Sequence, residues 1–165
     1  MQAAHQAGRR AVIRLPHGAD DPEDPPREVY LLREAPYRWL FPRMAAVVHH
    51  GGAGTTAEAL LAGVPNAAVA FGGDQPYYGR RIHELGAGPR VAGSSPIKMR
   101  KLTVDRLTEL ITTLTTPDQA AQWLAGATAA RSHLLQERGL NVAVERLSKL
   151  MTNGDPLARS TSATE

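Results

Sequence analysis

Cysteine is absent from the 165 residues of this sequence. Without thiols the chain has no disulfide framework, no cysteine-based metal site and no cysteine nucleophile. No apolar run approaches the roughly 20 residues that a membrane-spanning helix requires. The N-terminus also lacks the pattern of a secretory signal peptide. These absences lead us to expect a cytoplasmic protein without stable membrane insertion.

The sequence also lacks blocks of like charge. Its net charge is +3, from 19 basic and 16 acidic residues that are scattered along the chain. Nucleic-acid-binding proteins usually gather their basic residues on one face or in one arm. We therefore expect no nucleic-acid partner, and the mild positive charge would attract a small anion only weakly.

Short apolar runs alternate with helical patterns in the first half of the chain. The helical patterns cover Tyr37–Met44, Thr56–Ala62 and Pro76–Leu85. Four runs are apolar on both faces, as buried parallel strands are: Ala11–Ile13, Val29–Leu32, Ala45–Val48 and Ala67–Phe71. This alternation predicts an α/β fold with a Rossmann-like parallel sheet.

The pattern becomes wholly helical after Val91. Apolar residues recur at helical spacing over 104–114 and 120–138, and Asn141 is placed to cap a third helix that reaches Leu150. The last residues, 153–165, have little to bury. We therefore expect one α/β domain over 1–152 with helices at its C-terminal end, followed by a disordered tail over 153–165.

One glycine-rich stretch is the strongest functional signal. The run His49-His50-Gly51-Gly52-Ala53-Gly54-Thr55-Thr56-Ala57-Glu58 follows a predicted strand and leads into a predicted helix. A turn of this kind brings backbone N–H groups and the positive end of a helix dipole to one point. Glycines let a ligand approach the backbone closely. The stretch therefore predicts a site for a phosphate or diphosphate.

The same residues resemble a known signature. His50–Glu58, then Gly63-Val64-Pro65 and Phe71–Pro76, is similar to the nucleotide-sugar signature of GT-B glycosyltransferases. The resemblance is to bacterial members of the UDP-glucosyltransferase superfamily, including sterol and antibiotic-sugar enzymes. It implies a partial C-terminal, donor-binding domain of the GT-B fold. The strand expected to open that domain, and the loop after it, have no counterpart in the chain.

The resemblance also assigns roles to residues. Glu58 would accept from the ribose hydroxyls. Four residues would bind the nucleotide diphosphate: His50, Gly52, Gly54 and Thr55. Each role has a structural alternative, since Thr55 or Thr56 could cap the helix and Glu58 could pair with the helix dipole. His49 should face away from His50 along the strand, and a packing or surface role is favoured for it.

Asp74 and Gln75 match the pair that binds the donor sugar. A carboxylate and an amide suit sugar hydroxyls, which need both acceptors and donors. Alternatively, Asp74 is the N-cap of the helix that opens at Pro76. The segment Arg33–Pro36 lacks the aromatic residue on which plant relatives stack uracil. The choice between uridine and thymidine therefore stays open.

We expect neither a metal nor a cofactor. The sequence contains no Asp-x-Asp pair, and Asp20-Asp21 lacks the required spacing. The helix end and His50 would instead stabilise the charge that develops on the leaving diphosphate. In the family, a histidine–aspartate pair of the acceptor domain supplies the general base. We therefore assign no catalytic residue in this chain.

These expectations favour the donor-binding domain of an inverting glycosyltransferase that uses a UDP- or TDP-hexose. The acceptor domain would be a partner chain or a missing N-terminal half, so the chain would be a fragment, a split subunit or a mis-started reading frame. The alternative is a non-catalytic nucleotide-sugar-binding or regulatory subunit of a split enzyme. A dinucleotide-binding oxidoreductase fits poorly, because the turn is Gly-Gly-Ala-Gly and not Gly-x-Gly-x-x-Gly.

Overall fold

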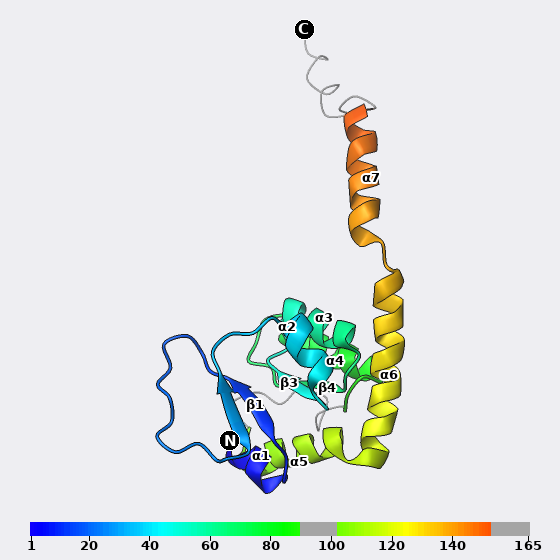
Figure 1. The fold of residues 1–165 in the computed structure, drawn as a ribbon. Helices are drawn as coiled ribbons and strands as arrows, with labels where there is room; N and C mark the ends of the chain where they lie inside the picture. Colours follow the sequence, from blue (N-terminus) through cyan, green and yellow to red (C-terminus); the bar gives the residue numbers. More distant parts are fainter. Residues whose placement is uncertain (90–101, 153–165) are drawn as a thin grey trace. The chain divides into compact units, whose positions relative to one another are not determined.

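A computed structural model describes residues 1–89 and 102–152 (Figure 1). The chain divides into two compact units, Met1–Ser132 and a second that begins at His133. Among the described residues, no helix combines the length and the apolar character needed to cross a membrane. The tail expected over 153–165 lies outside the described residues.

All four predicted strands are present and pair in parallel. Strand β1 (Ala11–Arg14) pairs with β2 (Val29–Leu32), and β3 (Val47–His49) pairs with β4 (Asn66–Ala68). We predicted one sheet, whereas the described strands form two separate two-stranded sheets (Figure 1). Among the described residues, neither β1 nor β2 hydrogen-bonds to β3 or β4.

The helix predicted over Tyr37–Met44 is divided. It begins as α2 (Tyr37–Leu40) and continues as the 3-10 turn η1 (Phe41–Arg43). Pro42 explains the change, because proline has no N–H to donate to the carbonyl four residues earlier. The ring of Tyr37 stacks on Phe41, with centroids 4.5 Å apart. Phe41 belongs to a buried cluster with Val47, Ala59 and Val64, and Tyr37 packs against this cluster.

Helix α3 (Ala53–Ala62) begins three residues earlier than predicted and ends at Gly63, which adopts a left-handed conformation with φ 70°. A glycine in this conformation commonly follows the last residue of a helix. Helix α4 (Gln75–Glu84) carries Pro76 in its first turn, as predicted. Ile82 of α4 is one of the most deeply buried large side chains of the described residues.

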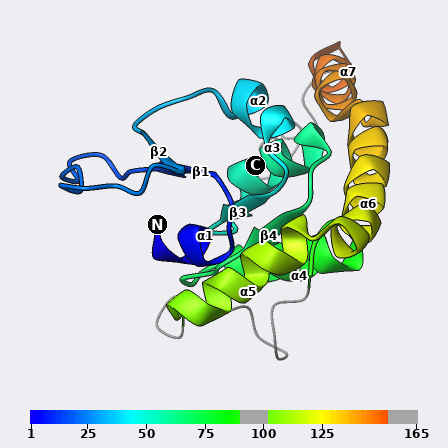
Figure 2. The same ribbon diagram turned by 60° about the horizontal axis from the view of Figure 1, so that its bottom comes forward.

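Helix α5 (Val104–Thr115) packs against β4 and confirms the first of the predicted C-terminal helices. Leu110 and Leu114 join residues at β4 in a buried cluster. The short helix α1 (Gln2–Gln6) lies beside α5 (Figure 2). The remaining helices are α6 (Pro117–Gln136) and α7 (Gly139–Thr152), which match the other two predicted helices within a few residues.

Candidate functional site

The glycine turn joins β3 to α3 and fits tightly against its surroundings. Gly51 has φ +87°, a left-handed conformation that favours glycine. A Cβ at Gly51 would stand 3.0 Å from the Ala68 Cβ and 3.0 Å from the Gln75 carbonyl oxygen. The turn therefore lies between the end of β4 and the start of α4, and only glycine fits at this position.

The N-terminus of α3 has no side-chain cap. Gly52 is the N-cap residue, and it carries no side chain to accept from the helix. Thr56 donates its backbone N–H and its hydroxyl to the Gly52 carbonyl, both at 2.9 Å. The N–H groups of Ala53, Gly54 and Thr55 precede this first helical hydrogen bond and have no intrahelical carbonyl to bond. Neither predicted capping threonine therefore caps the helix.

Gly54 faces open space. A Cβ built on it would meet no atom within 4 Å. The protein's own packing therefore does not require a glycine here. The absence of a side chain leaves the backbone at Gly54 accessible to a ligand.

The two histidines at the end of β3 differ in environment. His50 is exposed, and its imidazole lies over Gly52, where any added Cβ would collide with its Nε2 atom. His49 is buried. Burial lowers the pKa of His49 to about 4, and the neighbouring His50 adds to this effect while the hydrogen bond to Asn66 opposes it. The predicted opposite orientations agree with this difference in exposure.

Glu58 is ion-paired with Arg38, which sequence reasoning did not identify. The Nε atom of Arg38 lies 3.1 and 3.3 Å from the two carboxylate oxygens of Glu58. Arg38 belongs to α2, and nothing in the sequence indicates its approach to a residue 20 positions later. Because α3 begins at Ala53, Glu58 lies beyond its first turn. This weakens the helix-dipole alternative, since that effect is confined to the first turn.

The loop before α4 is shaped by Gln75. Its Oε1 atom accepts from the backbone N–H groups of Phe71 at 2.6 Å and Gly72 at 3.2 Å. The amide nitrogen of Gln75 thereby keeps its two donors for another partner. Asp74 is exposed and occupies the N-cap position of α4, yet its side chain makes no capping hydrogen bond. The capping alternative for the Asp74 carboxylate is therefore not seen.

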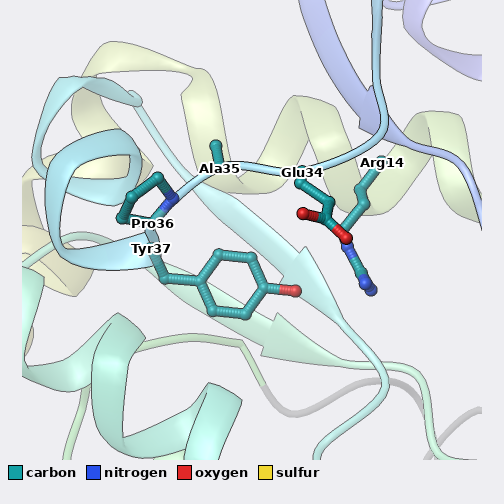
Figure 3. Close-up of a pocket in the computed structure, with 5 residues that line it drawn as sticks. All are labelled: Arg14, Glu34, Ala35, Pro36 and Tyr37. Atoms are coloured by element: carbon teal, nitrogen blue, oxygen red, sulfur yellow. The ribbon is translucent and has the colours of Figure 1, made fainter.

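A pocket of about 440 Å³ opens at the carboxyl ends of β1 and β2. It is lined by five residues: Arg14, Glu34, Ala35, Pro36 and Tyr37. Figure 3 shows the Tyr37 ring below this segment, with its hydroxyl directed toward Arg14 and Glu34. Open parallel sheets commonly bind ligands at this end of their strands. Tyr37 supplies an aromatic ring one residue beyond the segment in which we found none.

Comparison with known proteins decides the family. Residues 2–136 match the family described as "Erythromycin biosynthesis protein CIII-like, C-terminal domain". The chain belongs to this family. This family is a C-terminal domain of GT-B glycosyltransferases, and the match confirms the resemblance found in the sequence.

Two plant relatives illustrate the similarity. Sterol 3-beta-glucosyltransferase UGT80B1 of Arabidopsis thaliana is 39% identical over 137 residues, covering 83% of this chain and 21% of the relative. UGT80A2 of the same species is 42% identical over 112 residues, covering 67% of this chain and 17% of the relative. The chain thus spans about a fifth of the length of these relatives.

Solved structures agree on the fold. The glycosyltransferase VinC, solved in complex with DTDP, is 28% identical, with a TM-score of 0.69 over 80% of this chain and 31% of VinC. The spinosyn forosaminyltransferase SpnP is 21% identical, with a TM-score of 0.73 over 92% of this chain and 37% of SpnP. The α/β fold predicted from the sequence is therefore confirmed as that of a partial GT-B domain.

Proposed function

We propose that this chain is the donor-binding domain of an inverting glycosyltransferase that transfers a hexose from a UDP- or TDP-sugar to an acceptor hydroxyl. The observation that carries the proposal is the uncapped N-terminus of α3. A Cβ at Gly54 would meet no atom within 4 Å, and the imidazole of His50 lies over the N-cap residue Gly52. This arrangement matches the needs of a diphosphate in a protein of glycosyltransferase ancestry.

The chemical role of this helix end is to stabilise the leaving group. When the bond between the sugar and the diphosphate breaks, negative charge grows on the diphosphate oxygens. The N–H groups of Gly54 and Thr55, and the imidazole of His50, would donate to those oxygens as the charge develops. The two N–H groups are held in place by α3, and the imidazole of His50 lies over Gly52. On this proposal the diphosphate needs no bound metal ion.

Glu58 would accept from the two ribose hydroxyls. The ion pair with Arg38 supports this role because it directs the Glu58 carboxylate toward α2. The pocket lined by Glu34 and Tyr37 would receive the nucleotide base. Tyr37 directly precedes Arg38 in the chain, so this pocket lies close to the ion pair. The ring of Tyr37 offers a surface for stacking.

Asp74 and the free donors of Gln75 would bind the hydroxyl groups of the donor sugar. The carboxylate of Asp74 accepts, and the amide nitrogen of Gln75 donates. The two residues follow each other at the start of α4, and Gly51 of the glycine turn packs against Gln75. The sugar and diphosphate positions would therefore be adjacent.

Isothermal titration calorimetry with UDP, TDP, UDP-glucose, TDP-glucose and ADP tests this proposal. We expect binding of uridine or thymidine nucleotides in the presence of EDTA. His50→Ala should weaken the binding of UDP or TDP by about 1–3 kcal/mol, the scale for a lost hydrogen bond to a charged group. His17→Ala is the matched control, because His17 is exposed and lies outside the site. Equal effects of the two substitutions, or binding that requires a metal, would contradict the proposal.

A further inference from the structure

Two polar side chains, His49 of β3 and Asn66 of β4, are buried next to each other. His49 ends β3, and Asn66 begins β4 with no exposed surface. In the register of the strands, Asn66 pairs with Val47, and His49 pairs with Ala68. His49 and Asn66 are therefore diagonal neighbours on one face. Burying such groups is costly unless they are hydrogen-bonded.

A chain of hydrogen bonds links both residues to the glycine turn. The Asn66 amide nitrogen donates to the Val64 carbonyl at 3.1 Å. The Asn66 Oδ1 atom lies 3.5 Å from His49 Nε2. The backbone N–H of Gly51 donates to His49 Nδ1 at 3.0 Å. These hydrogen bonds thus connect the loop before β4, through two buried side chains, to the first glycine of the turn.

The direction of each bond fixes the proton on the imidazole. A backbone N–H can only donate, so Nδ1 of His49 must be unprotonated to accept from Gly51. The remaining proton of the neutral ring therefore sits on Nε2 and points at the Asn66 oxygen. The lowered pKa of His49 agrees with a ring that stays neutral. A protonated ring would carry a proton on Nδ1 and lose the bond to Gly51.

Gly51 sets the direction in which the rest of the turn runs. Gly51 has a left-handed φ, and Ala68 and Gln75 leave no room for a side chain there. Its N–H is held by the hydrogen bond to His49. We propose that His49, anchored by Asn66, is a positioning residue that sets the path of the glycine turn and so aims His50 and the first N–H groups of α3 at the diphosphate. This inference rests on the function proposed above.

Two substitutions of similar size separate positioning from packing. His49→Asn puts an amide oxygen near the place of Nδ1 and can still accept from Gly51. His49→Gln reaches toward Asn66 and puts no acceptor at that place. We expect the Kd for UDP to stay within about threefold of the wild type for His49→Asn and to rise about tenfold or more for His49→Gln. A role in packing alone would make the two losses equal.

Amide and imidazole NMR of the free, full chain provides a readout without ligand. We expect the Nε2–H tautomer at His49, and a Gly51 amide resonance shifted by its hydrogen bond in the wild type and in His49→Asn but not in His49→Gln. If His49→Gln does not fold, Asn66→Ala takes its place. Asn66→Ala removes the anchor, and it should raise the Kd for UDP about threefold or more.

The outcomes separate the two proposals. UDP binding by the wild type together with equal affinities for His49→Asn and His49→Gln would overturn the positioning role alone. An Nδ1–H tautomer at His49 would also overturn it. Failure of the wild type to bind UDP or TDP would overturn the proposed function, and the positioning of a diphosphate with it. Loss of affinity in His49→Gln, rescued in His49→Asn, supports both.

Discussion

Replacing Gly54 by alanine should make the protein more stable and make it bind nucleotide less tightly. Gly54 is the second residue of α3, and an added Cβ would meet no atom within 4 Å in the free protein. Alanine is favoured over glycine by about 0.8–1 kcal/mol inside a helix, and we expect about half of this at the first turn. The free energy of unfolding should therefore rise by about 0.5 kcal/mol.

The same methyl group would occupy the space through which a diphosphate reaches the helix N–H groups. Losing one hydrogen bond to a charged group costs about 1–3 kcal/mol, so the Kd for UDP should rise about fivefold or more. Urea unfolding and calorimetric titration measure the two effects separately. Because the effects have opposite signs, a general loss of structure cannot produce both.

Ala57→Gly is the matched control for Gly54→Ala. Ala57 is exposed and lies on the next turn of α3. Its replacement should lower the free energy of unfolding by up to about 1 kcal/mol and leave the Kd for UDP unchanged. If Gly54→Ala binds UDP as tightly as the wild type, the space in front of Gly54 is not the diphosphate site, and the reasoning fails.

Two other predictions concern the sugar and the pH. Asp74→Asn should leave the Kd for UDP nearly unchanged and reduce the extra affinity that the attached sugar gives; the reverse pattern in calorimetry would mean that its role is misassigned. The free energy of unfolding should fall by about 3 kcal/mol as the pH drops from 6.5 to 4. Over this range His49 takes up a proton in the unfolded chain, whereas in the folded chain its pKa is about 4 and it stays mostly neutral. Urea titrations at each pH should show this loss level off below pH 4, and His49→Asn should remove it; an unchanged slope in that variant would show that His49 is not its source.

Local patterns predicted most of the elements. The four apolar runs form strands as predicted, but burial on both faces is found only for β4. Val12 of β1, Tyr30 of β2 and Val48 of β3 are exposed. Helix α3 ends where the predicted pattern ends, because Gly63 follows it and glycine takes the left-handed conformation at no steric cost. The start of α3 was missed by three residues, because Gly52 takes the N-cap position and offers no side-chain signal. The predicted helix over Tyr37–Met44 is divided because Pro42 cannot donate to the carbonyl four residues earlier.

Contacts between distant segments could not be predicted. Arg38 and Glu58 meet because α2 packs on α3, and neither residue signals the other in the sequence. Arg14 and Tyr37 come together in a pocket only because β1 and β2 end at the same edge. His49 was expected to have a packing or surface role. Its bond to Gly51 depends on a side-chain orientation that spacing alone does not specify.

The most direct test of the central claim is a titration of the ¹⁵N-labelled chain with UDP, and in parallel with TDP, followed by amide NMR in EDTA. The claim is that the N-terminus of α3 binds the diphosphate of a nucleotide sugar. It predicts that the largest shifts fall on the amides of Gly52–Thr55 and that these shifts saturate together with those of His50. Saturable binding that leaves these amides unchanged and shifts residues elsewhere, or no binding of either nucleotide, would contradict it.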